Sequence, residues 1–176
     1  MTVSPDIRQE VRERANFVCE YCGVSEADTG DELTLDHYQP QSKGGSDELV
    51  NLIYCCNRCN LYKSDYWPEE DAPQLWHPRR ESFAAHFLLN ADGFLSALTD
   101  TGRFTVSRLH LNRPLLVAYR RNRLQREELA HEQERNKQTL QLVTELARRN
   151  LISLQETTDL SEEQRDLLNI LFQQEP

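Results

Sequence analysis

Residues 19–22 read CEYC and residues 56–59 read CNRC, with 33 residues between the two pairs. A Cys-x-x-Cys turn directs two thiolates toward one ion, and two such turns complete a closed tetrahedral zinc site. Closed sites of this kind supply folding energy to small domains whose cores are thin. The spacing therefore predicts a structural Zn²⁺ ion held by Cys19, Cys22, Cys56 and Cys59.

The fifth cysteine, Cys55, adjoins the second pair, but a turn from Cys55 to Cys59 would need a three-residue gap. We expect Cys55 to be a small packed side chain. The N-terminal stretch MTVSPDIRQE has no apolar signal core, and no apolar run approaches the roughly 18 residues of a membrane span. These features predict a cytoplasmic protein without a membrane partner, in which the thiols stay reduced.

The chain around the cysteines predicts a short α+β unit. Apolar residues recur at spacings of four in 5–18, which is typical of a helix that leads into the first pair. Residues 33–38 read as a strand ended by Pro40, and 49–54 feed a second strand that leads to the second pair. A short helix is expected to begin near Asn60.

The later chain predicts a hairpin followed by helices. Residues 83–89 and 94–98 flank a turn, residues 103–111 form a short helix, and a long helix runs over 114–149 with Asn112 as its N-cap. A last helix starting at Ser161 is expected to bury an apolar set. That set comprises Leu167, Leu168, Ile170, Leu171 and Phe172. We therefore expect three regions, 1–66, 67–113 and 114–176.

The net charge of −9 is distributed unevenly along the chain. It amounts to −8 over residues 1–70, +4 over 71–150 and −5 over 151–176. Most of the positive charge is arginine, which suits bidentate phosphate contact, although a solvated helix face explains such a run equally well. The arginines of 103–126 are the candidates for contact with a nucleic-acid backbone.

A second set of polar residues lies between and after the cysteine pairs. Asp36-His37 stands on the first strand, Asn51 precedes the second strand, and Asn60 follows Cys59. His37 is the only histidine of this group, and imidazole, with an ordinary pKa of about 6.5, suits a general base at neutral pH. The carboxylate of Asp36 and the amide oxygen of Asn60 are hard ligands that favour Mg²⁺ or Mn²⁺ over zinc.

This order of residues resembles the HNH endonuclease family. Residues 36–45 are similar to its DHxxPxSxGG stretch, and residues 51–63 are similar to its NLxxxCxxCNxxK stretch. The resemblance covers about residues 15–66 and implies a zinc-pinned ββα-metal core. It also implies an enzyme that hydrolyses phosphodiester bonds, with double-stranded DNA as the expected substrate, while the residues themselves are also compatible with RNA. The final motif residue is Asn60 rather than histidine, a weaker ligand.

The predicted site has named roles. His37 is the general base, Asp36 and Asn60 hold the catalytic cation, and Asn51 holds the loop and orients the His37 ring. Lys63, Arg103 and Arg113 are candidate substrate contacts. The remaining histidines and both tryptophans lack ligand spacing and are expected to pack or lie on the surface, namely His77, His86, His110, His131, Trp67 and Trp76.

Two other readings fit the same residues. One is a catalytically silent zinc module that binds nucleic acid. The other is a nuclease effector subunit of a multi-protein system, for example a defence system, that is active only with a partner. The long polar helix and the acidic tail motivate that second reading, and they predict a protein partner or self-association through the C-terminal helices.

Overall fold

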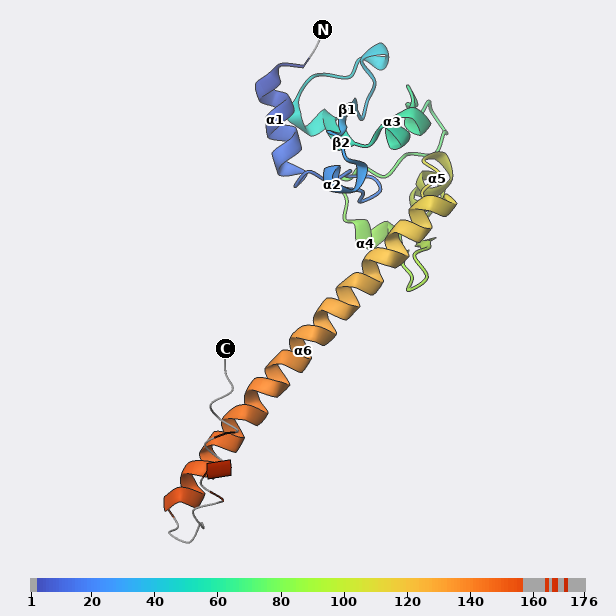
Figure 1. The fold of residues 1–176 in the computed structure, drawn as a ribbon. Coiled ribbons are helices and arrows are strands. Elements are labelled where there is room, and N and C mark those ends of the chain that lie inside the picture. Colours follow the sequence, from blue (N-terminus) through green and yellow to red (C-terminus); the bar gives the residue numbers. More distant parts are fainter. Residues whose placement is uncertain (1–2, 157–163, 165, 168–169, 171–176) are drawn as a thin grey trace. The chain divides into compact units, whose positions relative to one another are not determined.

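The computed structural model describes residues 3–156, 164, 166–167 and 170, and the chain divides into two compact units, Met1–Leu124 and Gln125–Pro176. The fold mixes short antiparallel hairpins with helices, as expected (Figure 1). The elements, in chain order, are α1 (Pro5–Arg14), α2 (Glu26–Thr29), β1 (Thr34–His37), two 3₁₀ turns (Gln41–Lys43 and Leu49–Asn51), β2 (Leu52–Cys55), α3 (Asn57–Lys63), α4 (Phe83–His86), β3 (Phe87–Leu89), β4 (Leu95–Ala97), α5 (Asp100–Arg108) and α6 (Pro114–Glu156).

The β1–β2 hairpin and α3 form the predicted ββα unit. β1 pairs antiparallel with β2, with Asp36 opposite Ile53 and His37 opposite Leu52. All four residues of β2 are buried, while α1 contacts β2 and α3 contacts β1. β2 is therefore the centre of a thin core, and β1 carries the predicted site residues at its C-terminal end.

Helix α1 is shorter than the predicted span. Ser4 caps it by accepting from the Ile7 amide at 3.3 Å, and Val11 is fully buried on its inner face. The helix ends at Arg14 because Asn16 and Phe17 adopt left-handed backbone conformations, with φ of 51° and 60°. This turn brings the chain into the first cysteine pair.

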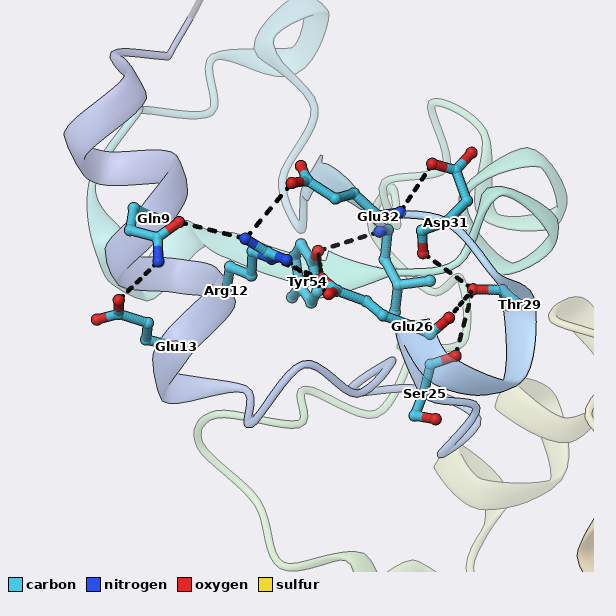
Figure 2. A network of polar contacts seen from close by, with 10 residues as sticks. Gln9, Arg12, Glu13, Ser25, Glu26, Thr29, Asp31, Glu32 and Tyr54 are labelled. Atoms are coloured by element: carbon cyan, nitrogen blue, oxygen red, sulfur yellow. Dashed lines mark hydrogen bonds and ion pairs between the residues drawn. The ribbon is translucent and has the colours of Figure 1, made fainter.

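A polar network ties α1 to α2 and β2 (Figure 2). The Arg12 guanidinium donates to both carboxylate oxygens of Glu26 at 2.7 Å, and the Tyr54 hydroxyl donates to the same carboxylate. The hydrogen bond from Arg12 is the main reason that the pKa of Glu26 falls to about 2. The network therefore keeps its charges, and its stabilising effect is lost only as the pH falls toward that value.

The second hairpin is confirmed, with one correction. β3 and β4 pair antiparallel, but residues 83–86 form the helical turn α4 rather than the start of a strand. Trp76 is 3% exposed and meets Phe83 and Phe87 edge to face, at ring centroid distances of 5.7 and 5.2 Å. This aromatic packing fixes Phe83 in a turn and attaches the extension to the core.

Two helix starts differ from the prediction. α5 begins at Asp100 rather than 103, since the Thr99 hydroxyl accepts from the Gly102 amide at 3.0 Å. Asn112 is not the N-cap of α6: its amide group instead donates to the Leu95 carbonyl and accepts from the Leu95 amide, both at 2.9 Å. Asn112 thus extends the β3–β4 hairpin as a strand residue would.

The second unit consists of the later part of α6, which continues to Glu156 rather than ending at Asn150, and the helical residues described after it. Leu167 and Ile170 were expected to be buried but are each 61% exposed, while Leu168, Leu171 and Phe172 lie outside the described residues. None of the helices in the described part of the chain has the length and apolar character that a bilayer crossing requires.

Candidate active site

The four cysteines of the two pairs converge as predicted. Their sulfur atoms all lie within 4.8 Å of one another, and the Sγ atoms of Cys22 and Cys56 are 3.7 Å apart. Four thiolates around zinc, with bonds of about 2.3 Å, place neighbouring sulfurs about 3.8 Å apart. The exposed fraction of each cysteine is 8% or less, so water is largely excluded. The cluster can hold zinc in the closed geometry of a structural site.

The fifth cysteine differs from these four. Hydrogen bonds from neighbouring thiols, first of all Cys19, lower the pKa of Cys56 and favour the thiolate that binds metals. Burial raises the pKa of Cys55 well above its ordinary value, as it does for Cys19 in the cluster, so it is position rather than pKa that separates Cys55 from the four. Cys55 is fully buried on β2 and is not part of the cluster, in agreement with the expectation that it packs as a small apolar residue.

An open hollow of about 310 Å³ lies at the C-terminal end of β1. It is lined by three of the predicted residues, Asp36, His37 and Asn60, together with Ser64 and Asp65. β1 supplies the first two and α3 supplies Asn60, so the antiparallel hairpin and the following helix bring together residues that are 24 positions apart in sequence. The hollow offers a base and several hard oxygen atoms to one reacting group.

Lys63 contacts Asp36 rather than solvent, which corrects its predicted role. It is fully buried, and its ammonium nitrogen lies 3.1 Å from each Asp36 carboxylate oxygen and 2.7 Å from the His37 carbonyl. A lysine buried in this way cannot reach a substrate phosphate. The paired charges instead hold α3 against the end of β1.

One carboxylate oxygen of Asp36 makes no hydrogen bond among the described residues. Only its Oδ1 makes a hydrogen bond of good geometry to Lys63, and its buried Oδ2 has no hydrogen-bond partner among the described residues. Burial raises the pKa of Asp36, while Lys63 acts in the opposite direction. A divalent cation beside Oδ2 would satisfy this acceptor, and the oxygen-rich lining of the hollow fits a hard ion such as Mg²⁺ or Mn²⁺.

The His37 ring is held by Asp47, a residue that sequence reasoning missed. His37 Nε2 lies 2.7 Å from Asp47 Oδ1, and the Gln41 amide donates to the same oxygen at 2.8 Å. The hydrogen bond to His37 is the main reason that the pKa of Asp47 is lowered. No ligand spacing marks Asp47, and only its place after the Gly44-Gly45 turn indicates that it returns to β1.

Asn51 holds the loop, as predicted, but it does not contact the ring. Its side-chain oxygen accepts from the Gln39 amide at 2.8 Å, and its nitrogen donates to the Gln39 and Ser46 carbonyls at 3.1 and 2.7 Å. Gly45 is enclosed here, since a Cβ atom would lie 1.7 Å from the Gln39 carbonyl oxygen. Asn51 thus fixes the turn that carries Asp47 to His37.

Helix α3 begins at Asn57, three residues earlier than predicted, with Cys56 as its N-cap. The backbone amide of Asn60 donates to the Cys56 carbonyl at 3.0 Å. Asn60 therefore lies inside the helix, directly after the predicted zinc ligand Cys59. The helix ends at Lys63, and the next residue, Ser64, turns the chain sharply with its φ of 54°. That turn brings Asp65 into the lining of the hollow, a second residue that the motif did not indicate.

The arginines predicted to contact substrate lie elsewhere. Arg103 is exposed and pairs with Asp100, and Arg113 lies over the Tyr62 ring, so neither lines the hollow. Burial lowers the pKa of Arg113, but the nearby cysteine thiolates outweigh it and raise the value. Arg120 is 3% exposed and donates to the carbonyls of Leu111 and Leu116. The arginines of 103–126 thus serve partly as interior supports.

The remaining histidines and the tryptophans pack or lie on the surface, as expected. His77 is buried against the Tyr38 ring and accepts from the Arg79 amide, and burial lowers its pKa to about 4. His86 contacts Thr99, and His131 is exposed on α6. Trp67 meets the edge of Tyr38 at 6.0 Å.

The family comparison agrees with this geometry. The HNH endonuclease family model matches residues 19–65, so this segment carries an HNH endonuclease domain that includes all four clustered cysteines and every residue of the hollow's lining. Neither a curated protein nor a solved structure matches the chain.

Proposed function

We propose that the protein is a metal-dependent endonuclease that hydrolyses phosphodiester bonds of DNA, with His37 as the general base. The observation that carries the proposal is the hollow in which His37, Asp36 and Asn60 meet, with the His37 ring held by Asp47 at 2.7 Å. The HNH domain at residues 19–65 supports a nuclease-type reaction.

His37 would activate the attacking water. When Nε2 donates its proton to Asp47, Nδ1 carries the lone pair and can accept a proton from water. The Asp47 carboxylate then stabilises the imidazolium that forms, in the manner of an orienting acid beside a catalytic histidine. The rigid loop held by Asn51 keeps this pair aligned before substrate arrives.

Asp36 and Asn60 would hold a divalent cation, which polarises the phosphate and stabilises charge on the departing oxygen. Lys63 would keep Asp36 in place, since its ammonium nitrogen lies 3.1 Å from both carboxylate oxygens, and the cation would be bound through Oδ2, which makes no hydrogen bond among the described residues. The zinc held by the four cysteines would have only a structural role, because a closed site leaves no position for substrate.

The metal requirement tests the proposal directly. Purified protein is expected to nick and linearise plasmid DNA with Mg²⁺ or Mn²⁺ and to lose this activity in EDTA, with gel electrophoresis as the measurement. Cleavage unaffected by EDTA, or absent with every divalent ion, would contradict the proposal. Weak activity that a protein partner raises would favour the partner-dependent version, which the exposed apolar residues Leu140, Val143 and Leu146 of α6 support.

The role of Asp47 gives a second prediction. Asp47→Asn should lower kcat about 10- to 100-fold with little change in KM, because it removes the charge that supports the His37 imidazolium and leaves substrate contacts intact. The same substitution in a His37→Ala background should cause no further loss, since the two residues act as one unit. Additive losses in plasmid cleavage would mean that Asp47 acts independently of His37.

A further inference from the structure

A second open hollow of about 510 Å³ adjoins the catalytic one. Ser64 lines both, so the two hollows are neighbours at the C-terminal end of α3. The other lining residues come from α3, from α5 and from the turn after α5. They are Leu61, Tyr62, Phe104, Ser107, Arg108 and His110. A nucleic-acid strand whose phosphate lies beside His37 can therefore place a neighbouring nucleotide here.

The walls of the second hollow are aromatic and apolar. The exposed His110 ring packs on the half-buried Tyr62 ring at a centroid distance of 4.5 Å, and Phe104 is also half-buried. Leu61 is 65% exposed. Aromatic faces of this kind bind nucleobases by stacking, with little dependence on sequence. Bases inside a duplex are already stacked, so such walls act on a base that is unpaired or extruded.

The charge of the second hollow suits a phosphodiester strand. None of the described residues that line it is acidic, although residues 1–70 as a whole carry a net charge of −8. Arg108 is held in place by a hydrogen bond to the Lys63 carbonyl at 3.0 Å and lies over the Tyr66 ring at 5.1 Å. A fixed guanidinium beside aromatic rings is suited to a nucleotide, whose phosphate is anionic and whose base is planar.

The backbone supports this assignment. Ser64 and His110 are two of the four described non-glycine residues with positive φ, at 54° and 48°, and both line this hollow. Such conformations cost free energy and persist where the surrounding structure requires them, often at binding sites. At His110 the left-handed backbone directs the ring onto Tyr62 and leaves it exposed to a ligand.

We propose that this second hollow is a nucleotide subsite that stacks one unpaired base next to the scissile phosphate, so that the enzyme prefers single-stranded or locally unpaired DNA over continuous duplex. This inference rests on the proposed function, because the subsite is defined by its place next to the catalytic hollow, with which it shares Ser64.

Binding and cleavage should be measured separately. In a His37→Ala background, fluorescence anisotropy with a labelled DNA strand gives the affinity for that strand alone, for its full duplex and for a duplex with one unpaired nucleotide. The two substrates with unpaired bases are expected to bind at least about tenfold more tightly than the full duplex. Equal affinity for all three would overturn the proposal.

Two substitutions test the aromatic walls. Tyr62→Leu keeps the bulk but removes the ring, and His110→Gly removes the second ring at a backbone position that glycine favours. Each should weaken binding of the unpaired substrates about 5- to 30-fold and leave the full duplex unchanged. Phe94→Leu is the matched control, since Phe94 is an exposed aromatic residue on the β3–β4 turn, outside the second hollow.

The outcomes separate the two proposals. Failure of the His37-intact protein to cleave any DNA substrate would contradict the proposed function. Cleavage of all substrates at one rate, together with unchanged binding in the Tyr62→Leu and His110→Gly variants, would contradict only the subsite. An equal loss for duplex and unpaired substrates would also overturn the subsite, because it would indicate contact with phosphate rather than with a base.

Discussion

Cys56→Ser is expected to remove zinc from the protein and to unfold the ββα core. The four sulfur atoms lie within 4.8 Å of one another, so a zinc ion bound to them links the first cysteine pair to the N-terminus of α3. The apolar core around β2 is thin. A structural zinc ion contributes on the order of 10–16 kcal/mol in small domains, which is comparable to the whole free energy of unfolding, about 5–15 kcal/mol. The thermal transition of the first unit should therefore disappear at ordinary temperatures.

Cys55→Ser is the matched control for this prediction. Cys55 is the neighbouring residue and is fully buried, but it lies outside the cluster. Its replacement should cost about 1–3 kcal/mol, because it buries a hydroxyl, and should leave one zinc ion per chain. Zinc content by elemental analysis and the melting temperature by circular dichroism measure both effects. If Cys56→Ser retained zinc and the wild-type melting temperature, the cluster would not be a structural metal site.

The features that were predictable from the sequence depend on fixed spacing. Two Cys-x-x-Cys turns can meet around one ion in few ways, and the antiparallel pairing of 34–37 with 52–55 follows from strands that each lead to or from a cysteine pair. The same pairing places Asp36 and His37 beside α3, which brings Asn60 to them. Local spacing in the sequence was therefore enough to predict the zinc ligands and the proximity of Asp36, His37 and Asn60.

The features that were missed depend on tertiary burial. A lysine near the end of a short helix is ordinarily expected to be exposed to solvent. Only the packing of α3 on β1 directs the Lys63 side chain inward to Asp36. Asp47 reaches His37 through a turn that depends on Asn51 and on the enclosed Gly45. No pattern of residue types in the sequence predicts this contact between Asp47 and His37. The Asn112 side chain does not cap α6, because it forms hydrogen bonds with the backbone amide and carbonyl of Leu95 at the edge of β4.

His37→Ala is expected to lower the rate of DNA cleavage about 10²- to 10⁴-fold, the usual contribution of a positioned general base. The His37 side chain lines the hollow and is 19% exposed, and its Nε2 lies 2.7 Å from the Asp47 carboxylate. His37 does not belong to the buried apolar core, so zinc content and melting temperature should stay close to wild type when it is replaced. The measurement is the single-turnover rate on plasmid or oligonucleotide with Mg²⁺, alongside both stability readouts.

His131→Ala is the control for the loss of a histidine as such, because His131 is exposed on α6 and belongs to the second unit. It should cleave at the wild-type rate. A His37→Ala protein that kept its zinc and also kept full activity would remove the enzymatic role of His37 and favour the silent zinc module. A variant that bound DNA normally yet failed to cleave it would separate the chemical step from binding, since only the loss of the base accounts for that combination.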